Sequence, residues 1–183
     1  MTAPSSPNPS HTGSSVAARE HIVHPFGPLY DGRSRVLILG SFPSPASRGQ
    51  AFFYGHPRNR FWRVIAAVLG QEVPATIGEK RAFCSANRIA LWDVLAQVDI
   101  IGASDASIKN PMANDLAPIL AAAPIERIFC TGAAAGRYYK RLIEPALGIP
   151  AEVLPSTSPA NAAMTFERLV HAYAPIADAL LRQ

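Results

Sequence analysis

The stretch RVLILGS, residues 35–41, is a run of apolar, largely branched side chains that ends in a glycine and a serine. A run without polar alternation is typical of a β-strand buried on both faces, as the strands of parallel sheets are. Three later stretches have the same character: IALWDVL (89–95), RIFCTG (127–132) and AEVLPST (151–157). Together they predict four strands.

Helical patterns separate these strands, at about residues 59–69, 77–86, 112–122 and 133–144, with a last one at about 162–181. Asn161 is expected to be a cap, and Asn110-Pro111 is expected to be an N-cap followed by proline at the first helical position. Regular strand–helix alternation predicts an α/β fold: a three-layer αβα sandwich around a central, mostly parallel four-stranded sheet.

The length of 183 residues suits one domain with a real core. The Ser/Pro/Thr-rich N-terminus predicts a disordered tail over residues 1–20 and a single domain over 21–183. The start of the chain lacks the basic-then-apolar order of a signal peptide, and no segment reaches the roughly 18 apolar residues that span a bilayer. We therefore expect a cytoplasmic monomer that does not contact a membrane.

The two cysteines, Cys84 and Cys130, lie far apart among apolar neighbours. Neither belongs to a C-x-x-C pair, and the sequence has no His/Cys spacing typical of zinc ligands. We interpret both as small buried hydrophobic residues of a reducing compartment, and we expect no metal and no cofactor.

The carboxyl ends of parallel strands form the edge of the sheet at which ligands bind. Here those ends read GSFP (40–43), WD (92–93), TG (131–132) and PSTS (155–158), so glycine and hydroxyl side chains gather there. Glycine leaves room for a ligand to approach the backbone. The sequence therefore predicts the functional site at this edge, with the loop YGHPRN (54–59) as one wall.

Arginine is concentrated around that loop: six arginines and one acid lie between residues 31 and 63. The guanidinium fork suits phosphate, because it donates two hydrogen bonds at once. A solvated basic surface is the alternative that charge alone leaves open.

Common catalytic signatures are missing from the sequence. It contains no G-x-S-x-G, no G-x-x-x-x-G-K-[ST] and no G-x-G-x-x-G after the first strand. Carboxylates are scarce in the middle of the chain (Asp93, Asp99, Asp105, Asp115), which gives a two-carboxylate glycosidase little support. Amides, hydroxyls, aromatic rings and arginines remain. These groups suit hydrolysis of a deoxynucleotide N-glycosidic bond, which needs donors aimed at the base, a positioned water and exclusion of solvent.

Three stretches resemble the uracil-DNA glycosylase superfamily: LILGSFPSPAS (37–47), FFYGHPRNRFWRVI (52–65) and LPSTSPAN (154–161). The second is similar to a stretch of the mismatch-specific uracil glycosylases, in which the first motif carries an asparagine that positions the water. Phe42 stands at that place here. The chain therefore resembles more closely the hypoxanthine-DNA (deoxyinosine) glycosylase branch, and this resemblance implies that Asn59 positions the catalytic water.

The resemblance also implies that Tyr54, with Phe53 as the second candidate, stacks on an extruded base. Ser41, Phe42 and His56 complete the expected base-binding set, and the expected DNA-binding residues are Arg58, Arg60, Ser156, Thr157 and Ser158. Several have a structural alternative: Asn59 as an N-cap, Tyr54 as a core aromatic, His56 as a structural histidine, Arg58 and Arg60 as solvated surface, and PSTSP as a simple turn. Asp93 is a weaker candidate for shaping the pocket.

These expectations describe a monofunctional DNA N-glycosylase that flips a deaminated base out of DNA and leaves an abasic site. Lysine is absent from the three stretches, so no Schiff-base lyase step is expected. Hypoxanthine is the first choice of base. The alternatives are a uracil or thymine mismatch-specific glycosylase, a non-catalytic damaged-DNA binding protein, and an enzyme that binds a nucleotide or phosphate ester.

Overall fold

The computed structural model describes residues 18–181. Its central sheet has the order β3-β2-β6-β7, and all three pairings in it are parallel. The four strands are β2 (Val36–Gly40), β3 (Ile89–Asp93), β6 (Arg127–Thr131) and β7 (Ala151–Leu154). Every residue of β2 and β3 is buried, as the unbroken apolar runs predict. The predicted parallel four-stranded sheet is confirmed.

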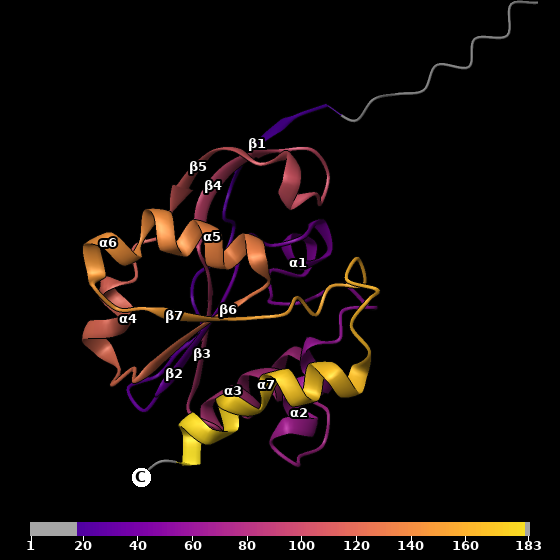
Figure 1. Cartoon of the computed structure of the whole chain (residues 1–183), viewed down its shortest axis with the longest axis vertical. Helices are drawn as coiled ribbons and strands as arrows, with labels where there is room; N and C mark the ends of the chain where they lie inside the picture. Colours follow the sequence, from indigo (N-terminus) through magenta and orange to yellow (C-terminus); the bar gives the residue numbers. More distant parts are fainter. Residues whose placement is uncertain (1–17, 182–183) are drawn as a thin grey trace, which may run out of the picture.

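Helices cover both faces of this sheet (Figure 1). One face carries α2 (Phe61–Val68), α3 (Ile77–Ala86) and α7 (Phe166–Leu181), and the other carries α4 (Ala117–Ala122), α5 (Ala133–Leu142) and α6 (Glu144–Leu147). The predicted three-layer α/β architecture is therefore confirmed.

A second, antiparallel sheet of order β1-β4-β5 was not predicted. It is formed by β1 (Glu20–Val23), β4 (Leu95–Ile100) and β5 (Lys109–Ala113), with a 3₁₀ turn η1 (Asp105–Ser107) between the last two. The predicted second strand, 89–95, spans β3 and the first residue of β4. Only Val94 separates them, so one apolar run serves two sheets.

The predicted helix start at Asn110-Pro111 is wrong, because both residues lie in β5. Asn110 adopts a positive φ of 47° and its Nδ2 donates to Asp99 Oδ2 across the hairpin at 2.6 Å. The β4–β5 pairing is irregular there, which is a place where a sheet tolerates proline. Helix α4 begins later, where Asp115 Oδ1 accepts from the Ala117 N–H at 2.9 Å.

Three further differences from the prediction concern the loop after β2, the start of the C-terminal helix and the N-terminal segment. The loop after β2 contains a short helix, α1 (Pro45–Gln50), which Ser44 caps through its hydroxyl and which has proline in its first turn. The C-terminal helix begins at Phe166 rather than near residue 162, after Thr165, whose hydroxyl accepts from the Arg168 N–H. Most of the predicted tail, residues 1–17, lies outside the described residues. Strand β1 begins at Glu20, within the range predicted as tail.

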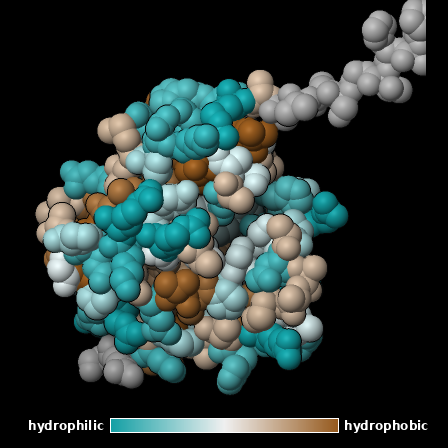
Figure 2. Space-filling view, turned by 45° about the horizontal axis from the view of Figure 1, so that its top comes forward, coloured by the Kyte–Doolittle hydropathy of each residue, from teal (hydrophilic) through white to brown (hydrophobic). Residues whose placement is uncertain are grey.

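The hydrophobic core lies between the sheet and the helices, and hydrophilic side chains cover most of the face shown in Figure 2. Within residues 18–181, no helix is long and apolar enough to cross a membrane.

Both cysteines are buried, as predicted, and neither forms a disulfide. Burial raises the pKa of the Cys84 thiol and that of the Cys130 thiol to about 12. The reactive thiolate is therefore scarce at pH 8. We expect iodoacetamide to leave both cysteines unmodified in the native protein and to modify both in denaturant, as measured by intact mass. Rapid modification of the native protein would contradict this account of the core.

Candidate active site

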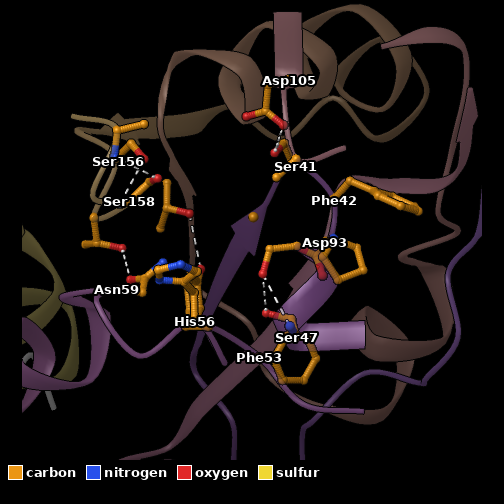
Figure 3. Close-up of a pocket in the computed structure, with 18 of the residues that line it drawn as sticks. Ser41, Phe42, Ser47, Phe53, His56, Asn59, Asp93, Asp105, Ser156 and Ser158 are labelled. Atoms are coloured by element: carbon orange, nitrogen blue, oxygen red, sulfur yellow. Dashed lines mark hydrogen bonds between the residues drawn. The ribbon is translucent and has the colours of Figure 1, made fainter. Parts of the chain in front are cut away.

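A cavity of about 320 Å³ lies at the carboxyl ends of the parallel strands, the edge at which the sequence places the site. We call it the strand-end cavity. Its walls come from the ends of β2, β3 and β6, the loop that contains α1, the HPRN loop, the η1 turn and the loop after β7 (Figure 3). Pockets for small ligands measure roughly 300–1,000 Å³, so the cavity has room for one compact group.

Asn59 lies on the wall of this cavity, just before α2. Its Oδ1 accepts from the Phe61 N–H at 2.9 Å and from the Thr157 hydroxyl at 2.8 Å. The first contact fixes which atom is the oxygen, because a backbone N–H needs an acceptor. Asn59 thus binds the first N–H of α2 from one residue before the N-cap position, which Arg60 occupies, so the alternative that Asn59 is itself the N-cap is wrong. Its Nδ2 has no acceptor among the described residues, so the carboxamide still has donors to offer to the cavity.

Arg60 organises the loop that faces Asn59. Its guanidinium donates to the carbonyl oxygens of Thr157, Ser158, Asn161 and Met164. These contacts use four of the five N–H groups of the side chain. Arg60 therefore shapes the PSTSP loop from within and has little left to donate to a DNA phosphate.

The three residues of the loop after β7 differ in what they can reach. Thr157 is buried, and its hydroxyl is directed to Asn59. Ser156 and Ser158 are half-buried and line the cavity, and the Ser156 hydroxyl accepts from the Ser158 N–H at 3.2 Å. Asn161 donates from Nδ2 to the Ser156 carbonyl at 2.9 Å, so it holds this turn together.

Tyr54 occupies the inner wall of the cavity with an unusual backbone conformation, φ 52°. Its ring stacks on Phe61 with centroids 3.7 Å apart, and its hydroxyl lies 3.1 Å from Thr131 Oγ1. Burial raises its pKa well above the usual value, so the phenol is neutral. Phe53 also lines the cavity, and it packs in the core against Phe26 and Trp92. Both rings are thus core aromatics that border the cavity.

His56 and Arg58 lie on the loop that leads to Asn59. His56 lines the cavity, and its Nδ1 accepts from the Arg58 N–H at 3.2 Å, which leaves the Nε2 edge as the donor. Arg58 is exposed, and no ion pair of its guanidinium is found among the described residues.

Ser41 and Phe42 follow directly after β2, on the cavity wall. The Ser41 hydroxyl donates to Asp105 Oδ1 at 2.9 Å. Within the described residues, the Phe42 N–H donates to no protein acceptor. Burial raises the pKa of Asp105, and the negative charge of Asp93 adds to the effect.

Asp105 and Ser47 also line the cavity, although neither was predicted as a site residue from the sequence. The signal for Asp105 was the long polar loop leaving the ligand edge after the second strand. The sequence indicated Ser47 less clearly than Asp105. In the structure the Ser47 hydroxyl accepts from the Gly55 N–H at 3.0 Å. His24 had no signal at all: it lies before the first predicted strand, yet its Nε2 is 2.9 Å from Asp93 Oδ2.

Groups of three or more His, Cys, Asp or Glu side chains that could hold a metal ion do not occur within residues 18–181. The polar groups that face the cavity are carboxamide, hydroxyl, imidazole, carboxylate and backbone N–H groups.

The central parallel sheet thus carries this cavity at its strand ends, between an HPRN loop and a PSTSP loop. The model of the Uracil DNA glycosylase superfamily matches residues 28–179, and the chain belongs to this family of DNA glycosylases. Two relatives are called hypoxanthine DNA glycosylase, from Methanosarcina acetivorans (35% identical) and Methanosarcina barkeri (32% identical). Each aligns over 138 residues, 74% of this chain and 86% of the relative.

A solved structure is also similar. It is the solution NMR structure of a Methanosarcina acetivorans protein provisionally assigned as a uracil DNA glycosylase. It superposes with a TM-score of 0.74 at 29% sequence identity, and the match covers 86% of this chain and 99% of that one. The resemblance inferred from the three sequence stretches is thereby confirmed at the level of the family and the fold.

Proposed function

We propose that this DNA glycosylase excises deaminated bases, hypoxanthine first among them, and that it leaves an intact strand with an abasic site. The observation that carries the proposal is the strand-end cavity, in which Asn59 and Phe42 line one compact space. The names of the two Methanosarcina relatives support hypoxanthine as the base.

The proposed reaction breaks the bond between the sugar C1′ and the base nitrogen, and a water oxygen forms the new bond to C1′. An extruded base would enter the cavity and place C1′ beside the HPRN loop. Donors that bind the departing base anion lower the barrier, because they act where charge develops. The Phe42 N–H and the His56 Nε2 edge are suited to that role.

In this proposal Asn59 positions the water. Its Oδ1 has two lone pairs: the Phe61 N–H takes one, and the Thr157 hydroxyl takes the other. A hydroxyl rotates readily, so a turn of the Thr157 O–H releases one lone pair for a water proton. An amide oxygen is sufficient, because the oxocarbenium-like sugar is reactive enough to need little help from a base.

Phosphate contact is proposed for Arg58, Ser156 and Ser158, which are exposed or half-buried around the cavity. Arg58 carries the electrostatic part. We expect Arg58→Ala to lower the slope of log affinity against log salt for duplex DNA by about 0.9, the change expected from one lost phosphate contact. Arg33→Ala is the matched control. Arg33 precedes the start of β2, whereas the cavity lies at the carboxyl end of that strand, so this variant is expected to keep the slope. An unchanged slope in Arg58→Ala would remove this residue from the DNA interface.

An incision assay tests the proposal. The protein is incubated with duplexes containing deoxyinosine, deoxyuridine, a G·T mismatch or no damage, and each product is run on a gel with and without alkali. We expect strand breakage in the deoxyinosine duplex only after alkali, which reveals an abasic site. Breakage of the uracil or mismatch duplexes alone would favour a uracil or thymine mismatch-specific glycosylase. Breakage before alkali would contradict monofunctional chemistry.

One observation favours a second candidate, a protein that binds damaged DNA without cleaving it. Both lone pairs of Asn59 Oδ1 are engaged in this structure. If the Thr157 hydroxyl never turns away, no lone pair is left for the water. Binding selective for deoxyinosine duplexes, without alkali-sensitive sites after long incubation, would support this candidate.

A further inference from the structure

The exposed side of α5 carries a cluster of positive charge that the proposed reaction does not use. Arg137, Lys140 and Arg141 are exposed, and their spacing of three and four residues places them on one side of the helix. We call these three residues the α5 basic face. Within residues 18–181 none of them forms an ion pair or a side-chain hydrogen bond, whereas Arg35 and Arg127 each pair with a glutamate. The charges of this face can therefore bind an anion.

The nearest acid along the chain acts on the other side of α5. Glu144 lies three residues after Arg141 but forms no ion pair with it. Burial raises the pKa of the Cys130 thiol and that of the Tyr139 phenol, and the negative charge of Glu144 adds to both shifts. Both of these groups are buried beneath the helix, so the charge of Glu144 is directed toward the core and leaves the α5 basic face without compensation.

Tyr138 holds the two arginines of this face in place. Its side chain is buried, and the guanidinium carbons of Arg137 and Arg141 lie 5.2 Å and 5.3 Å from the centre of its ring. An aromatic face attracts a cation at this distance, so both guanidinium groups lose part of their freedom before any ligand arrives. Side chains that are already ordered lose less entropy when they bind a partner.

The α5 basic face begins beside the mouth of the strand-end cavity. Helix α5 starts one residue after β6, whose last residue, Thr131, lines the cavity. Burial raises the pKa of Asp105 on the cavity wall and the positive charge of Arg137 opposes this shift, so Arg137 lies near Asp105. In Figure 3 Asp105 lies across the cavity from His56, which is two residues before Arg58. The α5 basic face and Arg58 therefore flank the cavity from opposite sides.

We propose that the α5 basic face binds the phosphate backbone of the duplex arm that leaves the cavity on this side, so that the protein grips DNA on both sides of the extruded nucleotide; this inference rests on the proposed function. A nucleotide that enters the cavity brings the flanking phosphates of its strand to the mouth. Arginine binds phosphate well through its planar fork. Arg137 and Arg141 are separated by about 6 Å along the helix axis, so they can contact different phosphates. DNA is favoured over an acidic protein because the face is continuous with the mouth that the nucleotide must enter.

The first measurement is the salt dependence of binding to an undamaged duplex. Arg137 and Arg141 are replaced together by glutamine, which removes the charges but keeps an apolar stem beside Tyr138. We expect the slope of log affinity against log salt to fall by about 1.8, the change for two lost phosphate contacts, and by about half of that in Arg137→Gln alone. Arg33→Gln, at the amino end of β2, is the matched control and is expected to keep the slope.

The second measurement shows which part of the duplex this face binds. A duplex with a central deoxyinosine is shortened to a few base pairs on one side of the lesion, and in a second duplex on the other side. We expect shortening of one arm to weaken binding by the wild-type protein about as much as the double substitution does. The double variant is expected to be insensitive to the loss of that arm and to remain sensitive to the loss of the other.

An unchanged salt slope in the double variant would overturn the inference and would leave an acidic protein as the partner of this face. Equal losses in the wild type and the variant when either arm is shortened would overturn it as well. Thermal unfolding checks that the double variant folds, and if it does not, the slopes of the two single variants decide. Failure of the wild-type protein to cleave any damaged duplex would instead refute the proposed function, and it leaves both binding measurements valid, so the two failures are distinguishable.

Discussion

Replacing Asn59 by alanine is expected to lower single-turnover excision of the base by on the order of 100-fold or more, while affinity for the damaged duplex stays within about twofold. The magnitude follows from removing a group that acts on the reacting water in the transition state, since such groups contribute roughly 10²–10⁴-fold. Binding is spared, because Asn59 lies inside the cavity wall and the proposed phosphate contacts lie around it.

Asn59 also stabilises α2, so the variant needs a control for folding. Loss of such a hydrogen bond costs about 1 kcal/mol, and the rates are therefore compared well below the unfolding temperature. Asn59→Asp keeps an oxygen for both the Phe61 N–H and the Thr157 hydroxyl. It is expected to fold as the wild type and to retain more activity than Asn59→Ala. Near-normal rates in Asn59→Ala would remove the carboxamide from the mechanism.

Replacing Arg60 by alanine is expected to lower the free energy of unfolding by on the order of 3 kcal/mol, and to abolish most activity at the same time. The change removes a charged group that binds four carbonyl oxygens of the loop after β7, each of which then loses a donor. The same loop carries Thr157, which orients Asn59. Stability and catalysis therefore depend on one side chain.

Denaturant unfolding and the incision assay measure the two effects. Lysine cannot reproduce a planar fork that reaches several carbonyls, so Arg60→Lys is expected to be nearly as damaging. Arg58→Ala, two residues away and exposed, is the matched control and is expected to unfold as the wild type. A stable Arg60→Ala with reduced salt dependence of DNA binding would show that Arg60 contacts phosphate instead of shaping the loop.

The central sheet was predictable because its strands are apolar on both faces. Runs such as VLILG can lie only where helices cover both sides, and the glycine and hydroxyl residues that follow mark the ligand edge. The antiparallel sheet was not predictable in the same way. Its strands are only partly buried, and β4 follows β3 after one residue, so the sequence shows a single run there.

The sequence predicted which site residues lie near one another, but it did not predict which hydrogen bonds they form. The HPRN and PSTSP loops were expected to share an edge, and the Asn59–Thr157 contact brings them together. Arg60 and Arg58 look equivalent in the sequence, but only the three-dimensional arrangement turns one guanidinium inward and leaves the other exposed. The His24–Asp93 pair joins the residue that follows β1 to the last residue of β3, so no spacing in the sequence could indicate it.

The most direct measurement is a crystal structure of the Asn59→Ala protein with a duplex that contains one deoxyinosine. The account predicts that the hypoxanthine leaves the duplex and fills the strand-end cavity, with its O6 at the Phe42 N–H and its C1′ next to residue 59. A deoxyinosine that stays stacked in the duplex, or a base bound outside this cavity, would contradict it.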